Sequence, residues 1–321
     1  MYSNAASISR PEISAFLEEA QGIEKLLIAT QVLPVYTSSA RAGRYPRLRI
    51  GNGELLKVGG DLRAPSGTYN EVSRSFEWDT FDCEDRGLTE RIDDAIKEEM
   101  KNFFDLEVTT SKNVRRQIML AHEKRVADLV MSSGNSGFTA TNSAVAYTEA
   151  NLATIDFAKD ITDAIARLEA KGVVPNTLIL ARDVFNRIRR STKLQGWVFG
   201  NALANSGNAD ITENMLASRF GLEKILVSGA KIDTATKGQA PSLTAIWPTS
   251  TVLLTDVKGG DFNNGGYGRT ITWGADVPGG LFATESYRDE TRRGDMVRVR
   301  MHSANKIIDT TAGELITTQW A

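Results

Sequence analysis

His122 and Glu123 come nearest to a catalytic motif in this sequence. In the metalloprotease pattern HExxH, two histidines four residues apart bind zinc on one helix face, and the glutamate acts as a general base. Here Val126 occupies the position of the second histidine, and His302 is the only other histidine of the chain. We therefore expect no zinc site, and we interpret His122 and Glu123 as a polar patch on the surface of a helix.

Two glycine-rich runs, Gly59-Gly60 and residues 259–268, could be compared with phosphate-binding loops. Such a loop needs a G-K-[ST] sequence between a strand and a helix, and neither run has one. We expect both to be loop tips. Arg293-Gly294-Asp295 matches an adhesion tripeptide, but Gly-Asp before an alternating strand is ordinary turn chemistry.

Cys83 is the only cysteine, which excludes an intrachain disulfide and a cysteine-based metal site. The neighbouring acids Asp82, Glu84 and Asp85 should raise the pKa of its thiol, so we do not expect a nucleophile. The sequence also has no recognisable pattern for a catalytic triad of serine, histidine and acid. The sequence therefore predicts no catalytic residue, no cofactor and no metal.

A cationic segment between Arg182 and Lys193 could contact phosphate. The whole chain, however, has 38 Lys+Arg against 40 Asp+Glu and a formal charge of -2, so it has no global basic field. Because a charge run is usually a solvated face, we favour that interpretation. Binding to duplex nucleic acid is not expected to be the main function.

The bulk composition predicts a globular protein that is long enough for two domains, with 321 residues and 41% hydrophobic content. The N-terminus has no charged segment followed by an apolar one, so we expect no secretory signal. No apolar run approaches the roughly 20 residues that span a bilayer. We expect a soluble cytoplasmic protein.

A long amphipathic helix between Asp105 and Asn135 must position the other elements. Its apolar stripe consists of Val114, Ile118, Ala121, Val126 and Leu129. Thr109, Thr110 or Ser111 could cap the start, and residues 132–135 end the helix. At about 1.5 Å per residue, residues 111–132 span roughly 30 Å, so this helix can serve as a spine for other layers.

Residues 41–86 predict a long two-stranded ribbon with a tip rich in glycine and proline. The first arm is basic and the second is acidic, so opposite charges can pair across strands or between subunits. An isolated ribbon is marginally stable in water, which favours a partner surface. A hairpin folded on its own domain is the alternative.

A helix is also predicted after the capping box Ser9 to Glu12. This helix could pack on another molecule or on its own domain.

Further elements follow in chain order. Residues 89–104 have a helical pattern, and residues 135–151 are interpreted as a polar link between two units. In the second unit, Asp156 should cap a helix that ends at Lys171-Gly172. Short apolar strands then alternate with helices, and this order is typical of a sheet covered by helices. Residues 297–301 predict a strand with one wet face.

Seven segments spread over most of the chain carry a family resemblance: IATQVLPVY, RAPSGTYNEV, DLEVTTSKNVRRQIMLAHEKRVADLVM, VVPNTLILARDVFNRIRR, MLASRFGLEKILVSGA, TAIWPTSTVLL and AGELIT. In order and spacing they resemble the major capsid proteins of tailed bacteriophages, which have the HK97-like fold. Each segment alone is weak evidence, because none carries catalytic chemistry. The spine helix of that family contains an internal glutamate, which is Glu123 here.

The resemblance implies an α+β fold and a division of the chain into five parts. These are an N-terminal arm (1–40), an extended loop (41–86), a peripheral domain with the spine helix (87–140), a mixed α/β axial domain (141–280) and a return to the peripheral domain (281–321). The arm and the loop would reach neighbouring subunits. The expected contact residues are Arg47, Arg49, Leu55, Leu56, Lys57, Val58, Leu62, Arg63, Glu77 and Asp79. Lys57 is also placed where some relatives form a covalent crosslink.

The implied function is structural. Hexamers and pentamers of the chain would form an icosahedral shell that encloses phage double-stranded DNA without sequence-specific binding. The implied partners are a separate scaffolding protein, a portal and decoration proteins, and the shell would be assembled in the host cytoplasm as part of the virion, with no membrane. The alternative is an encapsulin-like nanocompartment shell of the same fold. An enzyme with a nucleotide site in the second unit is disfavoured, because no phosphate loop is present.

Overall fold

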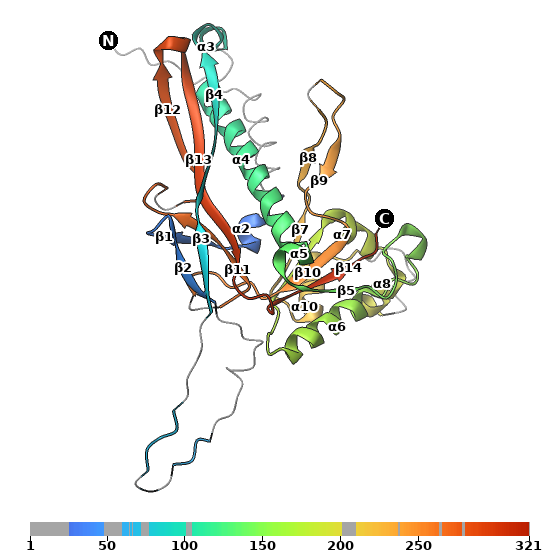
Figure 1. Cartoon of the computed structure of the whole chain (residues 1–321). Coiled ribbons are helices and arrows are strands. Elements are labelled where there is room, and N and C mark those ends of the chain that lie inside the picture. The colour runs from blue at the N-terminus through green and yellow to red at the C-terminus, as the bar shows by residue number, and fades with distance from the viewer. Residues whose placement is uncertain are drawn as a thin grey trace, which may run out of the picture.

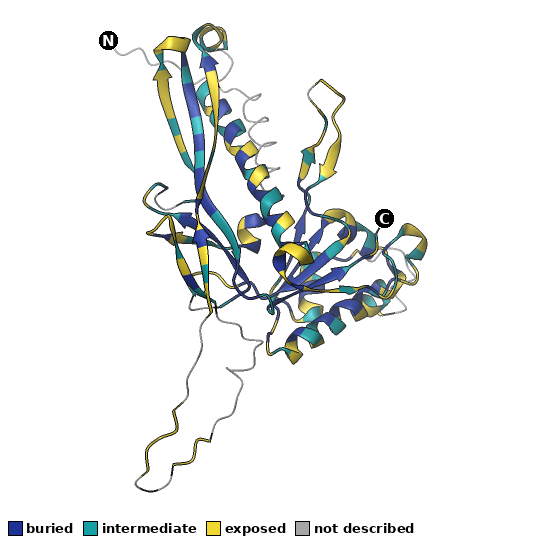
Figure 2. Ribbon diagram, viewed as in Figure 1, coloured by how far each residue is buried: buried dark blue, intermediate teal, exposed yellow. Residues whose placement is uncertain are grey.

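Two five-stranded β-sheets and one long helix form the framework of the molecule (Figure 1). The structure is a computed structural model, and it describes residues 26–47, 60–63, 65, 67–71, 77–100, 105–200, 210–236, 238–262, 265–277 and 280–320. The helix predicted after Glu12 therefore lies almost entirely outside the described residues. Figure 2 shows that burial concentrates in the second sheet and where β13 faces the long helix.

The first sheet has the strand order β1-β11-β13-β12. β4 also pairs with β13, along the edge of β13 that is opposite to β12. Its strands are β1 (Val35–Ser38), β4 (Glu84–Asp93), β11 (Gly268–Trp273), β12 (Ala283–Asp289) and β13 (Gly294–Ile307). The predicted alternation in β13 is confirmed, because Val297, Val299 and Met301 are buried. The face predicted to be exposed to solvent is half-buried, and both of its arginines, Arg298 and Arg300, bond to Glu285 on β12.

The spine helix α4 runs from Leu106 to Val130, and Asp105 caps it by accepting hydrogen bonds from the backbone N–H groups of Glu107 and Val108. Val114 and Ile118 pack on Val299 and Met301 of β13. The predicted stripe is wrong in one respect: Ala121 is exposed, whereas His122 and Glu123 are buried. The sequence stripe followed apolar residues only, and it therefore missed two polar side chains on the packed face.

Residues 89–93 form a strand and not the predicted helix. They belong to β4, whose ten residues pair antiparallel with β13 from Glu84↔Ser303 to Asp93↔Gly294. Only α3 (Asp94–Met100) is helical in this region. Local periodicity favours a helix here, but the partner strand lies some 200 residues later in the sequence, and its ladder of hydrogen bonds decides the conformation.

The second sheet has the order β5-β14-β10-β6-β7. Its strands are β5 (Thr139–Asn142), β6 (Thr177–Ala181), β7 (Lys224–Ser228), β10 (Thr251–Thr255) and β14 (Gly313–Thr317). The link predicted at residues 135–151 is therefore more than a polar connection. It contains the parallel partner of β14, with Phe138 and Tyr147 buried beside that strand.

The remaining helices and turns surround these sheets. They are α2 (Ala29–Val32), α5 (Ser133–Ser136), α6 (Phe157–Ala170), α7 (Arg182–Ile188), α8 (Thr192–Phe199) and α10 (Glu213–Phe220), with 3-10 turns at Glu149–Asn151 and Glu290–Arg292. The predicted caps are confirmed, because Asp156 accepts from Lys159 N and Gly172 adopts a positive φ. The buried residues of α6 include Phe157, Ile161 and Leu168, and those of α7 are Val184, Phe185 and Ile188.

Two short ribbons extend from this framework (Figure 1). β2 (Ala42–Arg47) pairs antiparallel with β3 (Glu77–Asp82), which confirms the base of the predicted ribbon. β8 (Lys231–Asp233) and β9 (Leu243–Ala245) form a second, shorter hairpin on the other unit.

Neither sheet is built from one continuous stretch of the chain. β11 already belongs to the first sheet, and β14 returns to the second sheet after β13. The spine also serves both units: Val126 and Val130 lie in the main core together with Val32 and Leu33, whereas Ile118 packs on β13. One cluster of buried residues therefore joins the end of the spine to the second unit.

Candidate assembly site at the base of the extended loop

The base of the extended loop is anchored by an aromatic cluster. Tyr45 on β2 is 1% exposed, and its ring lies 5.4 Å from the ring of Phe262 in a stacked arrangement. Phe81 and Cys83 complete the cluster together with Ile271 of β11. Burial of these side chains fixes the first residues of the loop on the first sheet.

A hydrogen bond crosses the ribbon at this point. Tyr45 Oη donates to Asp79 Oδ2 at 2.9 Å, and Thr80 N donates to Asp79 Oδ1 at 2.7 Å. Burial opposes ionisation of Asp79, but the hydrogen bonds from Thr80 and Tyr45 outweigh it and lower the pKa of this carboxyl. Burial, together with the bond to Asp79, raises the pKa of Tyr45. The pair is therefore a neutral phenol donating to a carboxylate.

Arg47 binds the same ribbon to the residue that follows β13. Its Nε donates to Ile308 O at 3.0 Å, and its Nη1 lies 3.6 Å from Asp79 Oδ2. The predicted contact residues Arg47 and Asp79 thus meet within one chain. An intersubunit role for them stays a proposal.

Other predicted contact residues lie farther along the loop. Leu62 is 89% exposed, and the guanidinium of Arg63 lies 4.8 Å from the centre of the Tyr69 ring. Glu77 is exposed on β3. The remaining five, Arg49, Leu55, Leu56, Lys57 and Val58, lie outside the described residues.

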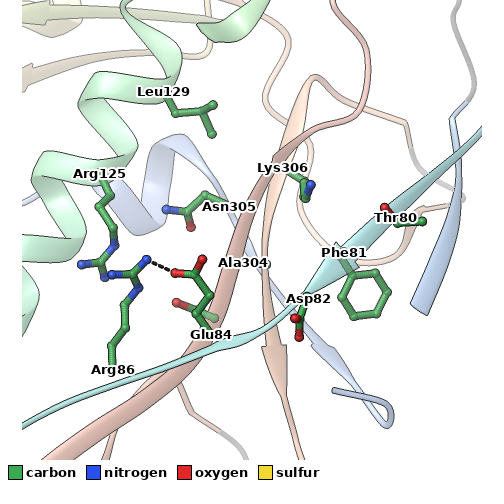
Figure 3. Close-up of a pocket in the computed structure, with 11 residues that line it drawn as sticks. Thr80, Phe81, Asp82, Glu84, Arg86, Arg125, Leu129, Ala304, Asn305 and Lys306 are labelled. Atoms are coloured by element: carbon green, nitrogen blue, oxygen red, sulfur yellow. Dashed lines mark hydrogen bonds and ion pairs between the residues drawn. The ribbon is translucent and has the colours of Figure 1, made fainter. Parts of the chain in front are cut away.

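A groove of about 570 Å³ opens beside the ribbon base, between β3, β4, the C-terminal part of α4 and β13 (Figure 3). Its cationic side chains come from three elements: Arg86 from β4, Arg125 from α4 and Lys306 from β13. Arg86 pairs with Glu84 on the groove wall. The groove is therefore lined by three cations and by two carboxylates, Asp82 and Glu84.

Arg125 is the half-buried arginine of the groove that has no acidic partner among the described residues. Its Nη2 lies 3.5 Å from Met301 Sδ, and no carboxylate of the described residues lies within 4.0 Å of its guanidinium. Burial lowers the pKa of Arg125 to about 10, and the positive charge of Arg86 adds to this effect. Sequence periodicity gave no sign of this side chain.

Glu123 lies at a second junction that the sequence analysis misjudged. It is 1% exposed, and its carboxylate accepts hydrogen bonds from Ile28 N at 2.9 Å, Ala29 N at 2.8 Å and Trp247 Nε1 at 2.6 Å. Burial raises the pKa of Glu123, and the three hydrogen bonds oppose that shift. The interpretation of Glu123 as a surface residue is therefore wrong. From the spine helix, Glu123 binds both the segment at Ile28 and Ala29 and, through Trp247, the second unit.

The motifs that were weighed as chemistry have structural explanations. Arg187 and Arg190 both pair with Glu149, so two members of the cationic segment are already matched within the chain. Burial raises the pKa of Cys83, with the charge of Asp82 as a smaller cause, so its thiol is a poor nucleophile. Arg293 adopts a left-handed conformation with φ 48°, as a turn before β13 requires.

The described ranges contain neither a metal-binding cluster nor a membrane-spanning helix. Within them, no group of three or more His, Cys, Asp or Glu side chains is arranged to hold a metal ion. None of the helices in those ranges combines the length and the apolar content that crossing a membrane requires.

The comparisons with known proteins agree on one fold. No protein-family model matches the chain. A curated major capsid protein of Pseudomonas phage JBD67 is 27% identical over 265 residues, which cover 79% of this chain and 80% of that protein. A crystal structure of a phage-related protein from Bordetella bronchiseptica RB50 has a TM-score of 0.67 at 20% identity and covers 95% of this chain and 96% of the other.

The capsid structure of cyanophage P-SCSP1u has a TM-score of 0.56 at 12% identity, over 89% of this chain and 86% of that one. The chain has the HK97-like capsid fold. Together with the sequence relative, this fold supports a phage major capsid protein, and it favours a structural protein over an enzyme.

Proposed function

We propose that this chain assembles as hexamers and pentamers into an icosahedral shell around phage double-stranded DNA. The relative named as a major capsid protein supports the general function. The near-neutral formal charge of -2 suits a wall that must enclose DNA without binding it tightly. The shell would be built in the host cytoplasm and become the capsid of the virion.

The observation that carries this proposal is the contrast between the base of the extended loop and its outer part. Tyr45, Arg47 and Asp79 hold the base in its own chain. Farther out, Leu62 and Tyr69 are 89% and 73% exposed. An apolar side chain that is exposed on a projecting segment gains free energy when a neighbouring molecule covers it, at about 25 cal/mol per Å² of apolar area.

The parts of the chain would share the work of assembly. The loop (41–86) and the N-terminal arm (1–40) would hold neighbouring subunits, and the ten predicted contact residues of the loop remain proposed intersubunit contacts. The second unit would surround the capsomer axis as the axial domain. A separate scaffolding protein would guide closure, and a portal and decoration proteins would complete the head.

The experiment is expression of the chain with and without its neighbouring genes, followed by sedimentation velocity and electron microscopy. We expect closed particles whose reconstructions contain both hexamers and pentamers, and phage particles whose nuclease-resistant DNA sediments with this chain. A chain that remains monomeric under every co-expression condition would contradict the proposal.

The alternative is a nanocompartment shell of the same fold. The particle content separates the two, because a nanocompartment would contain a folded protein cargo and no nuclease-resistant genome. The name of the curated relative favours the phage shell.

A further inference from the structure

Arg125 is a half-buried cation with no carboxylate within 4.0 Å among the residues that the structure describes. Its side chain leaves α4 near the C-terminal end of the helix and points into the groove between α4 and β4 (Figure 3). Among the described residues its hydrogen-bonding partner is the sulfur of Met301, a weak acceptor. Removing a cation from water costs free energy unless an acid compensates it.

Arginines elsewhere on the same sheet show what such compensation looks like. Arg298 and Arg300 both bond to Glu285, and Arg300 also bonds to Asp276 at 2.6 Å. Arg288 takes both oxygens of Asp94. These arginines are paired with carboxylates, and the buried Arg269 on β11 donates instead to the backbone carbonyls of Gly260, Gly265 and Gly268. Among the described residues, Arg125 has neither kind of partner.

The nearest charges leave the surroundings of Arg125 positive, because the effect of Arg86 is larger than the opposing effect of Glu84. The guanidinium groups of Arg86 and Arg125 lie close together in Figure 3, and like charges at this distance repel each other. Lys306 adds a third positive charge to the lining, and it has no carboxylate within 4.0 Å among the described residues. Because Arg86 already pairs with Glu84, a second carboxylate in the groove would pair with Arg125, whose guanidinium presents a fork of donors that matches two oxygens.

We propose that this groove receives an acidic side chain from the extended loop of a second copy of this chain, and that Arg125 is the residue that binds it. The proposal rests on the proposed function and assigns a specific pair of partners within it. The volume of about 570 Å³ exceeds that of one side chain, so a short stretch of extended chain can enter with its acid directed at Arg125.

The choice of occupant follows from the charges and the shape of the loop. Its described residues between 60 and 71 carry two carboxylates, Asp61 and Glu71, against one arginine, Arg63. Asn70 Nδ2 donates to Gly60 O at 2.6 Å, so the two segments that carry these acids are linked across the loop. This part of the loop projects away from the body of its own chain, so its acids can reach such a groove only on another molecule (Figure 1).

The test uses charge reversal in the full chain under conditions in which the unchanged chain forms particles. Arg125→Glu should abolish particles, and a second change, Asp61→Arg or Glu71→Arg, should restore them at least tenfold above the single variant. Arg115→Glu is the matched control, because Arg115 is an exposed arginine on the same helix, and it should assemble as the unchanged chain does. If neither reversal restores Arg125→Glu, the occupant is not an acid of the loop and the proposal fails.

Arg125→Met separates assembly from folding. Methionine keeps the length of the side chain beside Met301 and removes the unpaired charge, so the melting temperature should stay the same or rise while the yield of particles falls at least tenfold. Normal assembly of Arg125→Met would overturn the proposal. Failure of the unchanged chain to form any closed particle would instead count against the proposed function.

A pairwise readout does not require closed shells. Subunits with Arg125→Cys mixed with subunits with Glu71→Cys or Asp61→Cys should form an interchain disulfide in air, whereas each variant alone should not. Cys83 is buried and contributes no background. Absence of the disulfide in both mixtures would contradict the contact, even where the subunits associate in another way.

Discussion

Trp247 donates a hydrogen bond of 2.6 Å from its indole Nε1 to Glu123 Oε1, across 124 positions of the chain. The same carboxylate accepts the backbone N–H groups of Ile28 and Ala29. One buried side chain thus joins the entry segment, the spine helix and the loop before β10. A carboxylate is suited to this place because its two oxygens accept several donors at once.

Removal of the Glu123 carboxylate should destabilise the subunit strongly. Glu123→Ala leaves two backbone N–H groups and one indole N–H buried without an acceptor, which should reduce the free energy of unfolding by about 3–5 kcal/mol. Trp247→Phe removes a single donor and should cost about 1–2 kcal/mol. Urea denaturation of both variants and of the double variant measures the coupling. If the effects of the two changes are simply additive, the hydrogen bond does not join the two units.

His122 should make the subunit sensitive to acid. It is 2% exposed, and burial, with the charge of Arg125 as a second cause, lowers its pKa to about 4. The unfolded chain has a histidine pKa near 6.5 and binds the proton first, so the stabilisation is complete above pH 6.5 and is lost as pH falls toward 4. The loss amounts to about 3 kcal/mol at most, at 1.36 kcal/mol per pKa unit.

Denaturation between pH 7 and pH 4 measures this loss. His122→Phe should flatten the acid side of the stability curve, whereas His302→Gln should keep the slope that arises from His122. An unchanged slope in His122→Phe would assign the acid sensitivity to other groups.

The helix ends of the second unit could be predicted from capping residues that are close in sequence. Asp156 and Lys171-Gly172 mark the two ends of α6, and Thr212 with Gly221 marks those of α10, because each cap is made within a few residues of its own helix. Glu123 and β4 were misjudged for the opposite reason. Their partners, Trp247 and β13, lie far along the chain, and no periodicity within a window of residues reports such contacts. The unpaired charge of Arg125 was hidden in the same way.

Ile118 should be essential to the packing of the spine on β13. It is 4% exposed and lies beside Val299 and Met301. Ile118→Ala should cost about 2–5 kcal/mol, through lost burial and a residual cavity. Val108→Ala on the same helix is the control, since Val108 is 46% exposed and its truncation should change stability by less than about 0.5 kcal/mol. Equal melting temperatures for the two variants would contradict the described register of α4.

Gly294 should tolerate no side chain. It pairs with Asp93 at the start of β13, and a Cβ at this position would lie 2.5 Å from Ile92 O, a backbone atom that cannot move without the strand. Gly294→Ala should cost about 1–3 kcal/mol, as overpacked sites do. Gly134→Ala, where the nearest atom would lie at 3.8 Å, is the control. Thermal unfolding of both variants measures the difference, and a neutral Gly294→Ala would show that the end of the sheet is more adaptable than its pairing suggests.

The extended loop should contribute to assembly and not to the stability of its own subunit. Tyr45 and Asp79 already complete the base of the ribbon, so replacing residues 53–69 with a short Gly-Ser turn should leave circular dichroism and melting temperature nearly unchanged. The shortened chain loses Leu62, whose side chain is 89% exposed and therefore stabilises nothing within its own chain. Particles should no longer close, and sedimentation velocity should report free subunits or capsomers. Arg47→Glu is the contrasting variant, because it removes the bond to Ile308 O and should lower the melting temperature as well as the yield of particles. Shells of full size from the shortened chain would show that the loop does not hold neighbours, and unfolding of that chain would show that the loop belongs to its own core.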